Sequence, residues 1–187
     1  MLLVGIAITA IAGSLTSLLE FFSNDEMLRK ISLWRMGGLD GANYQKVVLI
    51  SVFSAFVLFT LPRFSTALNA LLLGESEARH LGLSVQKVKV RVILLVAAGV
   101  GVSVALAGSI AFIGLIIPHV IRLLIGPDHR YLLPMSALGG AILLLLSDTV
   151  ARTIFAPIEL PVGLVTALLG APFFISLLRQ RYRFGMQ

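Results

Sequence analysis

The 187-residue chain contains no cysteine and little charge of either sign. The absence of cysteine excludes disulfides, cysteine-ligated metal sites and thiol catalysis. Only 13% of the residues are Asp, Glu, Lys or Arg, whereas soluble domains carry about 25%. Hydrophobic residues make up 58% of the chain, and its mean hydropathy is +0.99. A water-soluble core cannot bury so much apolar surface, so the composition predicts a polytopic helical membrane protein.

Apolar segments alternate with polar residues or with Gly and Pro, and they cover approximately residues 2–22, 47–61, 92–107, 110–125, 132–150 and 162–178. About 20 helical residues cross a bilayer. The predicted fold class is therefore all-α, a transmembrane bundle of about six spanning segments in a single domain over residues 1–187. Only Gly108 and Ser109 separate the third and fourth segments. The fourth is short, so we expect a partial span, buried in protein, with a helix break at Pro118.

The distribution of Lys and Arg predicts the orientation, because basic residues are retained on the cytoplasmic side. If the odd-numbered segments run outward, the cytoplasmic stretches contain Arg63, Arg79, Lys87, Lys89, Arg91, Arg122, Arg130, Arg179, Arg181 and Arg183. The outer stretches then contain Arg29, Lys30, Arg35, Lys46 and Arg152. This count favours a cytoplasmic carboxy terminus. The net charge of +6 is spread between apolar runs and not on one face, so we expect no nucleic-acid partner.

Two connections are long enough to contain structure of their own. In the outer connection, residues 23–46, Asn24 followed by Asp25 and Glu26 predicts a capped short helix. In the inner connection, residues 62–91, we expect two short helices separated by a turn at Gly74.

Several motifs together resemble one family. They are Gly114-Leu-Ile-Ile-Pro-His119, Glu77-Ala-Arg79 with Gly82, Asp128-His-Arg130, Asp148-Thr-Val-Ala-Arg152 and Thr166-Ala-Leu-Leu-Gly-Ala-Pro172. In this order they are similar to the FecCD/BtuC-like permeases of ATP-binding-cassette importers, which carry ferric siderophores, haem or cobalamin. Residues 74–82 and 126–134 most resemble haem permeases. The chain is similar to the last six helices of a ten-helix permease, so the permease domain it represents is partial.

The resemblance implies roles for three groups of residues. An ATPase-coupling loop lies within 62–91 and contains Gly74, Glu75, Glu77, Ala78, Arg79 and Gly82. Arg152 docks the substrate-binding protein, although Asp148 at i−4 also allows a simple ion pair that stabilises the helix end. The translocation path is lined by Thr9, Gly13, Thr16 and Ser17 in the first segment and by Gly163, Thr166 and Gly170 in the last. On residue type alone, these small and hydroxyl side chains equally favour helix packing.

The resemblance also implies partners and a location. We expect a homodimer in the lipid of the bacterial inner membrane, with a cytoplasmic ATPase and a periplasmic substrate-binding protein. We expect no enzyme activity, catalytic residue, metal site or cofactor on this chain, because ATP and Mg²⁺ belong to the ATPase. His80, His119 and His129 have no metal-ligand spacing and are interpreted as structural.

Two other readings remain open from the sequence. One is an ion-coupled secondary transporter, for which only Glu20 and Asp148 would qualify as intramembrane acidic groups. The other is a nonfunctional fragment. Within the family, a siderophore or cobalamin permease is the alternative to a haem permease.

Overall fold

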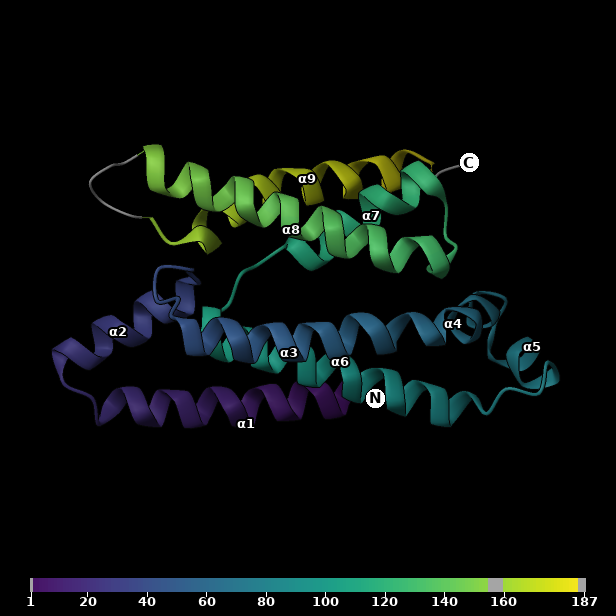
Figure 1. Ribbon diagram of the computed structural model, residues 1–187, viewed down its shortest axis with the longest axis horizontal. Coiled ribbons are helices and arrows are strands. Elements are labelled where there is room, and N and C mark those ends of the chain that lie inside the picture. The colour runs from purple at the N-terminus through teal and green to yellow at the C-terminus, as the bar shows by residue number, and fades with distance from the viewer. Residues whose placement is uncertain (1, 155–159, 185–187) are drawn as a thin grey trace.

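The structure is a computed structural model that describes residues 2–154 and 160–184, and all regular elements in these ranges are helical. The long helices form an elongated bundle, with short helices at its two ends (Figure 1). The elements are α1 (Leu2–Phe21), α2 (Asp25–Met36), α3 (Tyr44–Thr60), the 3-10 turn η1 (Leu61–Phe64), α4 (Ser65–Leu72), α5 (Glu75–His80), α6 (Val85–Ala107), α7 (Ile113–Ile125), α8 (His129–Ile154) and α9 (Val162–Phe184). The predicted all-α class is confirmed.

Within the described residues, four stretches are long and apolar enough to span a membrane: Leu3–Phe21, Tyr44–Leu72, Val85–Ala107 and His129–Ile154. Two shorter apolar helices, Ile113–Ile125 and Val162–Leu177, correspond to the fourth and sixth predicted segments. α7 has 13 residues, a length of about 20 Å at 1.5 Å per residue. That is less than the roughly 30 Å of a hydrocarbon core, so the expectation of a short fourth segment is confirmed.

One predicted boundary and one predicted helix break are wrong. α6 begins at Val85 and not near residue 92, because its basic first turns are also good helix formers. The second segment ends about where predicted, because α3 stops at Thr60. The chain nevertheless continues directly into α4 through η1, where Pro62 is tolerated in the first turn. α7 runs through Pro118 to Ile125 without the predicted break. Packing against α8 and α9 offsets the one backbone hydrogen bond that this proline removes.

The bundle has two distinct ends (Figure 1). The α2 end carries α2, the loop after it, the chain reversal at 108–112 and the last turn of α8. The α5 end carries α4, α5 and the turn between α7 and α8. Short-range sequence signals determine where the helices at the α2 end begin. The Asn24 Oδ1 accepts a hydrogen bond from Met27 N (2.9 Å) at the start of α2, and the Asn43 Oδ1 accepts one from Lys46 N (2.8 Å) at the start of α3.

Three glycines at the α2 end bring three distant segments into backbone contact, and we call Gly37, Gly108 and Gly163 the glycine junction. A Cβ on Gly108 or on Gly163 would lie 1.9 Å from a backbone oxygen of α2, that of Trp34 and that of Met36 respectively. The Gly163 amide donates to the Gly37 carbonyl (3.1 Å), and the next residue, Gly38, donates to the carbonyl at the end of α6 (2.9 Å). The junction therefore fixes the end of α2 to the end of α6 and the start of α9.

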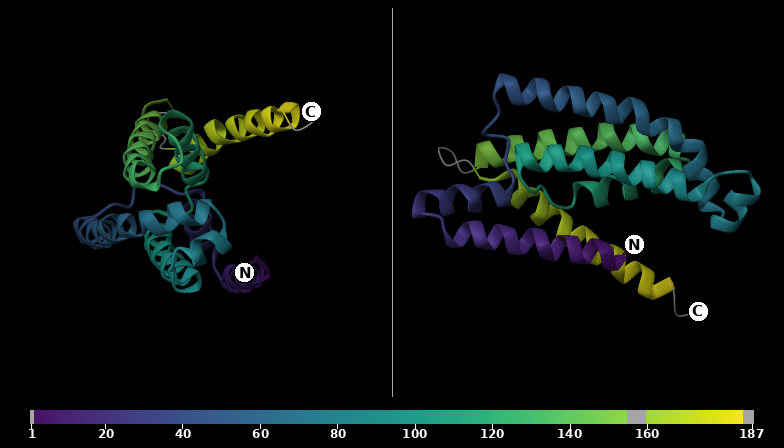
Figure 2. Two further views of the ribbon diagram at one scale, coloured as in Figure 1. Left: turned by 90° about the vertical axis from the view of Figure 1, so that its right-hand side faces the viewer. Right: turned by 90° about the horizontal axis from the view of Figure 1, so that it is seen from below.

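α1 and α9 each have an apolar face that the rest of the described chain leaves exposed. α1 packs mainly against α2, and its described side chains are almost all exposed. α9 starts in the small buried core of Ala151, Val162 and Val165, but it crosses α8 at an angle and leaves the bundle toward its carboxy-terminal end (Figure 2). Both helices thus present long apolar faces outward.

Candidate functional site

The six predicted coupling residues lie together at the α5 end. Gly74 and Gly82 flank α5 with φ angles of +115° and +80°, conformations that glycine adopts without a steric penalty. Each allows a sharp turn, so α5 stands as a separate short helix between α4 and α6.

α5 packs against α4 and α6 and is tied to α6 by an ion pair. Ala78 is fully buried (0% exposed), while Glu77 and Arg79 are exposed. The Glu75 carboxylate accepts a hydrogen bond from Lys89 on α6 and lies 3.6 Å from Nη2 of Arg79. The hydrogen bond from Lys89, followed by the charge of Lys89, lowers the pKa of Glu75 below its ordinary value. α5 is therefore anchored on one side and presents a charged surface on the other.

Three leucines beside α5 were missed by the sequence reasoning. Leu72, Leu73 and Leu81 are 53%, 68% and 64% exposed; Leu72 ends the apolar stretch Tyr44–Leu72, and the other two lie beyond it. Apolar side chains grouped on a polar surface are typical of a protein–protein interface. The sequence did contain a signal for this surface, because these leucines directly flank the polar sequence of α5 on both sides.

A polar bridge joins α4 to the turn between α7 and α8. Nδ2 of Asn69 donates to Oδ1 of Asp128 (2.6 Å), and Oδ1 of Asn69 accepts from the backbone N of His129 (2.8 Å) and lies 2.8 Å from its Nδ1. Asp128 also accepts from Arg130 N (2.9 Å), as the cap of α8. The Arg130 amide first, and then Asn69, lower the pKa of Asp128. The sequence reasoning used Asp128-His129 only as a family motif and missed this bridge.

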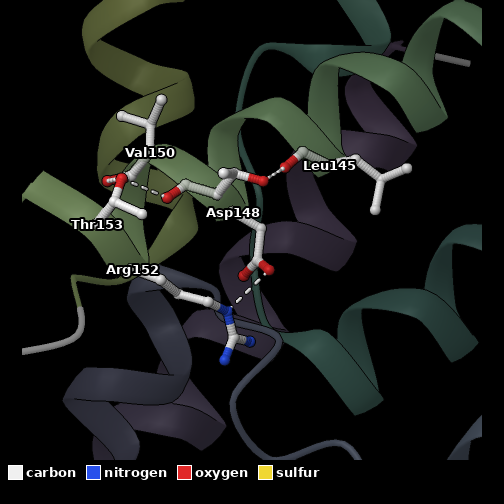
Figure 3. A network of polar contacts seen from close by, with 6 residues as sticks. Leu145, Asp148, Val150, Arg152 and Thr153 are labelled. Carbon is white, nitrogen blue, oxygen red and sulfur yellow. Dashed lines mark hydrogen bonds and ion pairs between the residues drawn. The ribbon is translucent and has the colours of Figure 1, made fainter.

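At the α2 end, Arg152 and Asp148 face one another on the last turns of α8. Nε of Arg152 donates to Oδ2 of Asp148 (2.8 Å), so the predicted i, i+4 ion pair is confirmed. The guanidinium extends from α8 toward the segment that contains α2 and its loop (Figure 3). The docking role of Arg152 stays a prediction, and the ion pair holds its side chain in a defined direction.

A cavity of about 630 Å³ opens beside this ion pair. Its walls come from α2, the loop after α2, the ends of α6 and α8 and the start of α9. Its charged lining residues are Lys30, Asp40, Lys46, Asp148 and Arg152. Nζ of Lys46 also donates to the carbonyl oxygen of Gly41 (2.8 Å). The cavity therefore combines charged groups of both signs with apolar walls, to which Trp34, Leu106 and Leu160 contribute.

The predicted path residues of α1 lie on an open surface. Thr9 and Thr16 donate to the carbonyl oxygens of Gly5 and Ala12 (2.9 Å each), and a Cβ on Gly13 would meet no atom within 4 Å. Ser17 is exposed. This face of α1 is available to another helix, to water or to lipid.

The predicted path residues of α9 face the interior of the chain instead. Gly163 belongs to the glycine junction, and Thr166 is 1% exposed and donates to the Gly163 carbonyl (3.1 Å). A Cβ on Gly170 would lie 2.4 Å from the side chain of Phe112. The structure does not bring these residues together with those of α1, and the path role of both groups stays a prediction.

The ionisable residues considered for other functions also have structural partners. Glu20, at the end of α1, accepts from Nη1 of Arg35 on α2 (2.8 Å). His119 packs its ring edge-on against Phe173 of α9 (6.3 Å between centroids). In residues 2–154 and 160–184, no three His, Cys, Asp or Glu side chains group as metal ligands would.

The family model, the similar sequences and the similar solved structure all point to one family of permeases. The family model described as the FecCD transport family matches residues 1–180. The chain is 49% identical over 184 residues to the hemin transport system permease protein HmuU of Yersinia pestis, covering 97% of this chain and 54% of that protein. It is 44% identical over 185 residues to the cobalamin import system permease protein BtuC of Halobacterium salinarum, covering 97% and 48%. The chain thus spans about half the length of the curated relatives it matches.

A solved structure has the same fold. It is described as an inward-facing conformation of a transporter of the metal-chelate ABC type, and it superposes with a TM-score of 0.89 at 38% sequence identity. The superposition covers 95% of this chain and 58% of the solved one. The similarity therefore extends over almost the whole bundle.

Proposed function

The chain belongs to the FecCD transport family, and we propose that it forms part of the membrane-spanning permease subunit of an ATP-binding-cassette importer for an iron chelate. The observation that carries the proposal is the placement of two different polar surfaces at opposite ends of one apolar bundle (Figure 1). The α5 end presents a short anchored helix with charged and leucine side chains. The α2 end presents the Arg152–Asp148 pair beside a charged cavity.

The proposed topology places the α5 end in the cytoplasm. Lys87, Lys89 and Arg91 follow α5, and Arg179 lies near the described end of α9, so positive charge concentrates at this end as it does on cytoplasmic surfaces. The α2 end then faces the periplasm of a bacterial inner membrane, and the carboxy terminus is cytoplasmic.

The proposed mechanism is alternating access in a homodimer. A separate ATPase binds α5 through the residues from Gly74 to Gly82, and the closing of that ATPase moves α5. The periplasmic substrate-binding protein docks at the α2 end through Arg152. The path opens near the dimer axis, with α1 and α9 as its lining helices, which agrees with their long outward faces (Figure 2). ATP and Mg²⁺ bind the partner, so this chain supplies no catalytic residue.

Haem is the proposed cargo, with cobalamin as the second candidate. The 49% identity to a hemin permease supports haem, and identities of 42–47% to vitamin B12 permeases support cobalamin. No side chain described here discriminates between two such large planar chelates. A ferric siderophore is the third candidate, from the family resemblance alone.

The test is ATP-dependent uptake into liposomes by the full-length subunit, purified with its ATPase and supplied with its binding protein. Haem, cobalamin and a ferric hydroxamate siderophore are offered separately. We expect uptake of haem that requires ATP hydrolysis and the binding protein. Uptake driven by an ion gradient without ATP would establish the secondary-transporter alternative, and a complex that binds no ATPase would contradict the proposal.

A further inference from the structure

The amide of Asn69 is the only described side chain that hydrogen-bonds both Asp128 and His129. These two residues follow it by 59 and 60 positions. The orientation of the amide is determined by its partners. A carboxylate oxygen only accepts, so the group facing Asp128 is the NH₂, and the backbone N–H of His129 only donates, so the group facing it is the carbonyl. The Nδ1 of His129 then donates to the same carbonyl (2.8 Å). One side chain thus makes three polar contacts across two elements.

The bridge lies between the short helix α5, which contains predicted coupling residues, and α8, the longest described helix. Asn69 lies on α4, which is separated from α5 only by Leu73 and Gly74. Asp128 and His129 begin α8, which has 26 residues and is therefore about 39 Å long. The other end of α8 carries Asp148 and Arg152. A displacement of α4 thus reaches the far end of the bundle through a single helix.

The environment of the bridge strengthens it. Asn69, Asp128 and His129 are all partly buried, so water competes less for their hydrogen bonds than at an open surface. The contact between Asn69 and Asp128 has an ionised acceptor, which makes it stronger than a hydrogen bond between neutral groups. α4 and η1 also pack along α8, so the bridge reinforces an existing interface.

We propose that Asn69 is a positioning residue that links the coupling helix α5, through α4, to α8, so that movement imposed by the ATPase at the α5 end reaches the Arg152 end. The inference rests on the proposed function, because it requires an ATPase that pushes on α5. Asn69 is not among the predicted site residues, and none of those residues connects α4 to α8.

Three variants of Asn69 and Asp128 separate linkage from simple stability. Asn69→Ala removes every contact of the bridge. Asn69→Asp keeps an acceptor for His129 but places a second carboxylate 2.6 Å from that of Asp128, where two negative charges repel. Asp128→Asn keeps the bridge, because the amide oxygen can still accept from Nδ2 of Asn69 and from Arg130 N at the position of Oδ1. Asn43→Ala is the matched control, because it also removes an asparagine cap but joins no two helices.

The measurement is the number of cargo molecules taken up per ATP hydrolysed by the reconstituted complex, with haem as cargo, or cobalamin if the wild type takes up only cobalamin. We expect this ratio to fall about tenfold in Asn69→Ala and Asn69→Asp, as expected when one or two net hydrogen bonds are lost, while ATP hydrolysis continues. Asp128→Asn, which keeps the acceptor oxygen, and Asn43→Ala both keep the ratio. A purely structural role would lower uptake and hydrolysis in proportion to the amount of folded complex, leaving the ratio unchanged.

The outcomes separate the two proposals. If the wild-type complex takes up its cargo with ATP and both Asn69 variants keep the wild-type ratio, the linkage role of Asn69 is wrong and the proposed function stands. If Asp128→Asn, which keeps the acceptor oxygen, lowers the ratio as far as Asn69→Ala does, the hydrogen bonds of the bridge are not the cause and the inference is overturned. If the wild-type complex shows no ATP-dependent uptake, the proposed function itself fails and the inference falls with it.

Discussion

Replacing Gly163 by alanine tests whether the glycine junction holds the α2 end together. The added Cβ would lie 1.9 Å from the backbone oxygen of Met36. Ordinary van der Waals contact begins at 3.4 Å, so the two backbones must separate by about 1.5 Å. That separation breaks the hydrogen bond from the Gly163 amide to the Gly37 carbonyl, which is 3.1 Å long.

The expected cost has two parts. Overpacking of this kind costs about 1–3 kcal/mol, and a buried polar group that loses its partner costs about 1–3 kcal/mol more. A total of about 2–6 kcal/mol lowers the Tm of a chain of this size by roughly 5–20 °C, at about 2–4 °C per kcal/mol.

The assay is thermal unfolding of the purified chain in detergent, followed by tryptophan fluorescence. Trp34 is the single tryptophan of the chain, and its carbonyl belongs to the junction, so its emission reports on this region. Gly101→Ala is the matched control, because a Cβ there meets no atom within 4 Å and alanine favours the helix by about 0.5–1 kcal/mol. A Gly163→Ala variant that unfolds within 2 °C of the wild type would refute the close packing of the junction.

Three further predictions concern the two ends of the bundle. Arg152→Glu weakens docking of the substrate-binding protein while membrane insertion is unchanged; an unaltered docking affinity in a pull-down would rule out the assignment. Carboxyl-carbon NMR places the pKa of Glu75 below its ordinary value, and Lys89→Met raises it. Because the folded-state pKa of Glu75 is lowered, the contribution of the pair to stability is complete above the unfolded-state pKa and is lost as the pH falls through the lower value. Gly170→Ala lowers the Tm, since its Cβ would lie 2.4 Å from the side chain of Phe112; an unchanged Tm would contradict that contact.

The helices at both ends of the bundle were predictable because their signals are local. Asn24 with the acidic residues that follow it predicts the start of α2, and Gly74 predicts the separation of α4 from α5. The i, i+4 pair of Asp148 and Arg152 was predictable for the same reason. Each of these features depends on residues within one or two helical turns.

The contacts that join distant segments could not be predicted from one sequence. Gly37 and Gly108 lie just after the ends of α2 and α6, and Gly163 lies in the first turn of α9; nothing local indicates that their backbones meet. Asn69 lies among the apolar residues 67–72 of α4, a pattern that does not identify its partner. The path residues show the same limit, because small residues favour helix packing and water-lined surfaces equally, and the structure places Gly163 and Gly170 in packing contacts.

The glycine junction also has a consequence for biosynthesis. The carbonyl of Gly37 receives its hydrogen bond from Gly163, a residue that the ribosome adds 126 positions later. At about 5–20 residues per second, α2 is made several seconds before the start of α9 can pair with it. The α2 end is therefore completed only after the start of α9 has been synthesised, and a chain stopped before Gly163 would leave the Gly37 carbonyl without this hydrogen bond.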